Sequence, residues 1–171
     1  TSYTFALGTN ATACAAAIVT FAGVDTLKPI DTTAATISTG NSKFPSATSI
    51  TTQTPKTALV MFCQASGVAT TSSFWNNSFW KATDPTTLAE IYDQPGTNCS
   101  VGAAWATKLR AGASGTGSDS ISASCNWGAI LVAIRSCAPK ITTQPVTSST
   151  ICQGGSSTGI SFTATGMGAL S

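Results

Sequence analysis

The sequence contains no histidine among its 171 residues. A Ser-His-Asp or Cys-His catalytic site therefore cannot form. The six cysteines include no Cys-x-x-Cys pair, which is the spacing typical of zinc and iron–sulfur sites. Because the commonest nucleophilic and metal-dependent sites are excluded, the sequence predicts no enzyme activity, no metal site and no cofactor.

Charged residues are scarce as well, at 8% of the chain, against about 25% in ordinary soluble domains. The net charge is +2, and the basic residues are scattered along the sequence. A nucleic-acid-binding surface needs clustered basic side chains that neutralise phosphates. We therefore expect no nucleic-acid partner.

The chain has no apolar run of about 18 residues, the length that a membrane-spanning helix needs. This predicts no membrane insertion. It also has neither an initiator methionine nor a signal peptide, which would show a basic start followed by an apolar core. We expect the chain to be a piece of something longer, either matured by cleavage or seen in part.

The residues that dominate instead are Thr, Ser, Ala and Gly. An even number of cysteines in such a charge-poor chain is typical of an oxidising compartment, and predicts an extracellular or cell-surface location. The candidates for disulfide bonds, with the pairing left open, are Cys14, Cys99, Cys125 and Cys137. Cys63, inside the apolar run ALVMFCQ, is expected to be a small buried residue.

Three apolar segments predict the central strands. Residues 127–136 (WGAILVAIRS) and 57–65 (TALVMFCQA) have no polar stripe, which favours strands covered on both faces. Residues 101–110 alternate well enough for a third strand, with a short helix as the alternative.

Two hairpins are expected from the flanking segments. Residues 118–125 should lead through Asn126 into the strand at 127–136. At the start of the chain, residues 1–24 should form a hairpin that ends in an apolar strand over 14–24. The segment 32–55 is either a long connection or a short edge strand.

Counted together, the short strands and frequent turns predict an all-β fold, an antiparallel β-sandwich of jelly-roll or Ig-like type. The sandwich should occupy residues 1–138. Residues 139–171, with a strand at ISFTAT, should begin a second β module that is only partial. An incomplete module exposes strand edges that something must cover.

Two resemblances support this division. SYTFALGTNATACAAAIVTFAGVDTLKPID, within residues 1–31, and the segment from WKATDPTTLAEIYDQPG to LVAIRS are similar to repeated β-sandwich modules of large bacterial surface proteins and phage tail fibres. The tail ITTQPVTSSTICQGGSSTGISFTATG resembles the opening strands of immunoglobulin-like adhesin repeats. In the first family the initial segment is a closing hairpin, so residues 1–31 would belong to a preceding or neighbouring module.

The resemblance implies a structural subunit of an extracellular filament or cell-surface adhesin, assembled through strand edges and aromatic contacts. Residues 1–24 would complete a sandwich of a neighbouring copy, or pack beside their own module as an added layer. The expected partners are other copies of the chain, neighbouring domains and, in the alternative of a carbohydrate-binding module, glycans. Candidate contact aromatics are Phe74, Trp75, Phe79 and Trp80. Their rings could stack on a sugar, but a core or a subunit contact is the preferred interpretation.

The remaining polar motifs allow functional and structural interpretations. Glu90 and Asp93 could be paired catalytic carboxylates, but two acids three apart are far more often a solvated strand end. Asp25 and Asp31 could bind Ca²⁺, but turns are the preferred interpretation. The candidate glycosylation sites are the sequon residues Asn10, Asn76 and Asn98 and, by resemblance to O-glycosylated Asp-Ser/Thr-apolar motifs, Thr26, Thr32 and Ser120.

Overall fold

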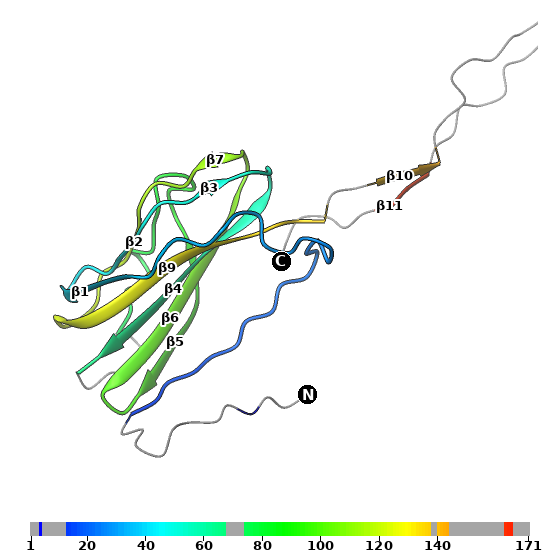
Figure 1. Cartoon of the computed structure of the whole chain (residues 1–171). Helices are drawn as coiled ribbons and strands as arrows, with labels where there is room; N and C mark the ends of the chain where they lie inside the picture. Colours follow the sequence, from blue (N-terminus) through cyan, green and yellow to red (C-terminus); the bar gives the residue numbers. More distant parts are fainter. Residues whose placement is uncertain (1–3, 5–12, 68–73, 138–139, 144–162, 166–171) are drawn as a thin grey trace, which may run out of the picture.

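The computed structural model describes residues 4, 13–67, 74–137, 140–143 and 163–165 (Figure 1). Within these ranges the protein is all-β and contains no helix, so no helix there could cross a membrane. The strands are β1 (Ser38–Ser42), β2 (Ser46–Ala47), β3 (Thr51–Thr52), β4 (Thr57–Ser66), β5 (Ala89–Gly96), β6 (Cys99–Lys108), β7 (Gly112–Ala113), β8 (Gly117–Ser118), β9 (Cys125–Ile134), β10 (Lys140–Thr143) and β11 (Thr163–Thr165).

Five of these strands form one antiparallel sheet in the order β1-β9-β4-β6-β5. The central strand β4 pairs with β6 on one side and β9 on the other, and all three are long (Figure 1). β4 is buried along most of its length and β9 along much of it, on both faces, which is why these two segments are almost continuously apolar. The three strands predicted at 57–65, 101–110 and 127–136 are thereby confirmed.

The predicted hairpin between residues 118–125 and 127–136 is wrong. β9 pairs with β4 and β1, so both of its edges are occupied by strands that come earlier in the chain. Residues 117–121 lie elsewhere: β8 pairs with β2, and Ile121 forms a bridge with Trp75. β9 therefore pairs with strands that are distant in the sequence and not with the segment that directly precedes it.

The predicted strand at 14–24 is also not formed. Residues 13–23 run extended without strand pairing, and Val24 makes a single bridge with Ser136. The first arm of that predicted hairpin, with Tyr3, Phe5 and Leu7, lies outside the described residues. The segment 32–55 does contain a short edge strand, β1, followed by the two-residue strands β2 and β3.

The main core lies between one face of the five-stranded sheet and the short pairs β2–β8 and β3–β7 (Figure 1). The sheet contributes inward side chains from β4 and β9, and the facing segments contribute the large aromatics. Its most voluminous members are Leu59, Met61, Leu131, Ile50, Phe74, Trp75, Trp80, Leu88 and Ile121. We call the sheet face toward this core the inner face and the opposite one the outer face.

Gly102 on β6 shows how closely the aromatic segment packs on the inner face. A Cβ at Gly102 would lie 2.7 Å from the Trp75 ring, so any side chain there would displace the indole. Trp75 is fully buried and meets the Phe74 ring edge to face and the Trp80 ring at a tilt, with ring centroids 5.6 and 5.7 Å away. The absence of a side chain at Gly102 thus leaves the space that the Trp75 indole occupies.

β10 and β11 form a separate antiparallel pair at some distance from the five-stranded sheet (Figure 1). β11 falls within the predicted strand ISFTAT. The rest of the predicted second module, including Cys152, lies outside the described residues.

Candidate functional site

The outer face of the sheet is apolar and, among the described residues, is partly covered by one extended segment, residues 13–24, which we call the strap. Ala58 and Val60 of β4 are fully buried on this face. Phe21 and Val24 of the strap pack against them together with side chains of β4, β5, β6 and β9. Figure 1 shows the strap, in blue, running beside the sheet before the chain turns toward β1.

The C-terminal half of the strap is anchored by both packing and hydrogen bonds. The Phe21 and Trp105 rings meet edge to face with centroids 5.5 Å apart. The Cys137 backbone N–H donates to the Gly23 carbonyl oxygen at 2.7 Å, and the Asp25 N–H donates to the Arg135 carbonyl at 3.0 Å. This end of the strap is therefore tied to the chain that leaves β9.

The N-terminal half of the strap crosses the hairpin between β5 and β6. A Cβ at Gly96 would lie 2.4 Å from the Cys14 carbonyl oxygen and 3.2 Å from Ala15 Cβ. The strap backbone passes this close because Gly96 has no side chain.

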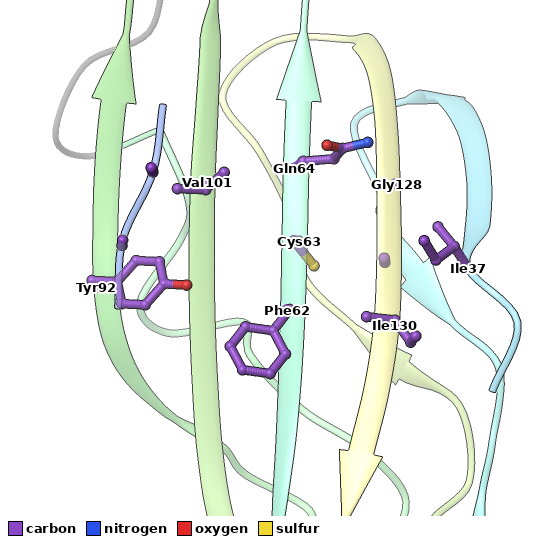
Figure 2. Close-up of a pocket in the computed structure, with 11 residues that line it drawn as sticks. Ile37, Phe62, Cys63, Gln64, Tyr92, Val101, Gly128 and Ile130 are labelled. Carbon is purple, nitrogen blue, oxygen red and sulfur yellow. The ribbon is translucent and has the colours of Figure 1, made fainter. Parts of the chain in front are cut away.

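Between these two anchors the strap leaves a cavity of about 330 Å³ against the sheet. Figure 2 shows its floor: Phe62 of β4, Val101 of β6 and Ile130 of β9 lie next to one another, with Tyr92 on one side and Ile37 on the other. Ala16 and Ala17 supply the wall formed by the strap. The small alanine side chains fill little of the space, so this part of the apolar face is left partly open.

Glu90 and Asp93 lie on the inner face and not at a solvated strand end. A register shift between Glu90 and Tyr92 places both acids on the same side of β5, although residues three apart in a regular strand point to opposite faces. The Trp80 indole N–H donates to Glu90 at 2.9 Å, and the Trp75 backbone N–H donates to Asp93 at 3.0 Å. Burial raises the pKa of both carboxyls.

Asp119 is the most unusual side chain of the core. It is 3% exposed, and neither carboxylate oxygen has a hydrogen-bond partner in the described part of the chain. Burial, with the nearby charges of Glu90 and Asp93, raises its pKa to about 7, although the backbone N–H groups of Ser120 and Asn76 offset part of this effect. The sequence contained a signal for its burial, since Asp119 lies two residues before Ile121 and therefore on the same inward side.

Asp25 and Asp31 have separate structural roles. Asp25 accepts the backbone N–H groups of Leu27 and Lys28 at 2.9 and 3.2 Å, as the turn interpretation predicted. Asp31 is buried and pairs with Arg135 at 3.2 Å. Burial alone would raise its pKa, but bonds from Thr54 and Gln53 and the Arg135 charge lower the pKa overall. This long-range ion pair was not predicted.

The four candidate aromatics divide into core and surface. Phe74, Trp75 and Trp80 are at most 1% exposed, whereas Phe79 is 47% exposed. Buried rings have no face to offer a sugar or a subunit, so the core alternative accounts for three of the four. Phe79, with the Lys81 ammonium 5.9 Å from its ring centroid, is the one that faces solvent.

The candidate disulfide cysteines lie in three regions. Cys14 is exposed on the strap, beside the hairpin that carries Cys99, while Cys125 is buried at the start of β9 and Cys137 adjoins Gly23. Cys63 is buried, as predicted, and burial raises the pKa of its thiol. Disulfide pairing among the four candidate cysteines stays a prediction.

The candidate glycosylation residues lie mostly in surface turns. Thr26, Asn76 and Asn98 are exposed, and Thr32 and Ser120 are half-buried. Asn10 lies outside the described residues. Whether any of them is modified stays a prediction.

Neither a family model, nor a curated protein, nor a solved structure matches this chain.

Proposed function

We propose that this chain is a structural module of an extracellular filament or cell-surface adhesin, built as a β-sandwich of jelly-roll or Ig-like type. The observation that carries this proposal is the strap: an extended apolar segment whose strand pairing is limited to one bridge at Val24, laid over an apolar sheet face that it covers incompletely. The partner we propose is the same segment of a second copy.

A segment that covers its own module can make the same contacts on a neighbour. Such an exchange costs little because no new interface is needed. The connection after the strap, residues 25–37, contains no strand, but the Ile30 bridge and the buried Asp31–Arg135 ion pair hold its middle against the end of β9. The strap would therefore be redirected to another copy from residues 25–28, with loss of the Asp25 backbone hydrogen bond. Exchange in one direction along a row of copies gives an open filament.

The two edge strands are less suited to assembly than the strap. β5 carries Pro95 and a register shift between Glu90 and Tyr92, and both features discourage the addition of a further strand. β1 has five residues, all small or polar. We therefore place assembly on the outer face, with the low charge of the surface and the cysteine content favouring an extracellular setting.

The test is assembly of the full chain, followed by light scattering over a range of concentrations and by electron microscopy. Phe21→Asp should weaken docking of the strap at least about tenfold, on its own module and on a neighbour alike, because burying a Phe ring contributes about 1.5–3 kcal/mol. The assembled fraction should therefore fall in favour of chains whose strap is undocked. Leu27→Asp is the matched control: it adds the same charge at a side chain that is 96% exposed and should leave assembly unchanged.

Two results would contradict the proposal. One is a wild-type protein that stays monomeric at every concentration, and the other is an equal loss of assembly in both variants. A monomer that binds a glycan array would favour the carbohydrate-binding alternative instead.

A further inference from the structure

We infer that Cys14 and Cys99 form a disulfide bond within the chain, which ties the N-terminal half of the strap to the hairpin between β5 and β6. The two residues meet at Gly96. The point at which a Gly96 Cβ would stand is 2.4 Å from the Cys14 carbonyl oxygen and 3.0 Å from Cys99 Sγ.

The register of the hairpin explains why Cys99 points toward the strap. Cys99 lies directly opposite Gly96 in the β5–β6 ladder, and directly opposed residues of an antiparallel pair have their side chains on the same face. The next residue, Ser100, points inward and accepts the Trp75 indole N–H at 2.9 Å. Since side chains alternate along a strand, Cys99 belongs to the outer face, where the strap lies.

The strap supplies the second thiol in an accessible position. Cys14 is exposed, whereas Cys63 and Cys125 are buried in the core. Gly96 leaves room for the strap backbone where any other residue would hold it away. The cross-linking site therefore consists of three residues: Gly96 on β5, Cys99 opposite it on β6, and Cys14 on the strap that crosses them.

The reaction requires a two-electron oxidant, for which we name a small disulfide such as oxidised glutathione. One cysteine thiolate attacks a sulfur of that disulfide and releases one glutathione thiolate, which leaves a mixed disulfide. The second cysteine thiolate attacks the protein sulfur of that mixed disulfide and releases the second glutathione. Two protein thiols are thereby oxidised to one disulfide, and one glutathione disulfide is reduced to two thiols.

The Cys14–Cys99 disulfide would hold in place the part of the strap that forms one wall of the outer-face cavity, where few packing contacts hold it. The Phe21 end of the strap is held by a ring contact and backbone hydrogen bonds, while Ala16 and Ala17 line the cavity in the other half. A link at Cys14 would hold the strap on its own module at both ends. Oxidation before assembly would then favour the closed monomer over exchange.

The experiment uses the full chain, equilibrated with reduced and oxidised glutathione, alkylated and digested with trypsin without reduction. Cleavage after Lys and Arg, except at Lys28–Pro29, places each of the six cysteines on its own peptide. The expected product is a linked pair of the peptides 1–43 and 82–108, which mass spectrometry detects and which reduction separates.

Cys14→Ser and Cys99→Ser should each abolish the linked pair, whereas Cys137→Ser should retain it as the matched control. Cys14 is exposed, so its replacement leaves the fold intact and keeps the test valid. Alkylated Cys14 after oxidation, a link from Cys14 to any other peptide, or a 1–43 to 82–108 link found only between chains would overturn the inference. The first two readouts are independent of whether the chain forms filaments. The third is read from the size of the oxidised chain on a non-reducing denaturing gel, where a link within one chain leaves the monomer mass unchanged.

Discussion

Asp119→Asn should make the protein more stable at pH 8 and leave its stability at pH 4 nearly unchanged. The pKa of Asp119 rises from 3.8 to about 7 in the folded state, mainly through burial. The folded protein therefore holds this proton more tightly than the unfolded chain. The stability that the proton provides is fully present below about pH 4 and is lost as the pH rises through 7.

The size of the effect follows from the same pKa. One pKa unit corresponds to about 1.4 kcal/mol, so the charged Asp119 costs the folded state up to about 4 kcal/mol at pH 8. Asparagine has nearly the same shape and no charge, and removes this cost. Burial also raises the pKa of Glu90 and Asp93, so part of the pH dependence should remain in the variant.

Urea unfolding at pH 4, 6 and 8 measures this prediction, with the free energy of unfolding as the readout. Asp25→Asn removes the same charge in the turn after the strap and should change the stability by less than about 0.5 kcal/mol at each pH. A gain from Asp119→Asn of equal size at pH 4 and pH 8 would show that its charge is not the cause.

The central strands could be predicted from the sequence because their signal is local. β4 and β9 are continuous apolar runs, and such runs fit a strand buried on both faces wherever its neighbours come from. Their partners could not be predicted in this way, since β9 pairs with β4 and β1 across long stretches of chain. The strap satisfies the apolar pattern of a strand, but side-chain packing holds most of it, and its backbone pairs with the chain after β9 only at Gly23 and Val24.

The candidate site was less predictable for a related reason. Glu90 and Asp93 share a face through a register shift, which spacing in the sequence does not reveal. The proximity of Cys14 and Cys99 depends on where the strap crosses a hairpin more than 80 residues later in the chain. Cysteine count indicates that disulfides are expected, but not which cysteines meet.

Trp75→Ala should lower the stability by about 3–5 kcal/mol, the cost of emptying the space of a buried large aromatic. Trp75 is fully buried over Gly102, between Phe74 and Trp80. Its indole N–H donates to the Ser100 hydroxyl at 2.9 Å, so that hydroxyl would lose its donor as well. Because small domains have total stabilities of about 5–15 kcal/mol, this loss could consume much of the total.

Phe79→Ala is the matched control, since it removes an aromatic ring from the same segment at a position that is 47% exposed. It should cost less than about 1 kcal/mol. Trp75→Phe separates the two contributions of the indole: it keeps most of the packing and removes the N–H donor, so its loss should be smaller than that of Trp75→Ala. Equal urea midpoints for Trp75→Ala and Phe79→Ala would contradict a core role for Trp75. Such a result would instead favour the role predicted for both rings from the sequence, a contact with a ligand or another subunit at the surface. Only a surface ring can be removed without leaving a cavity.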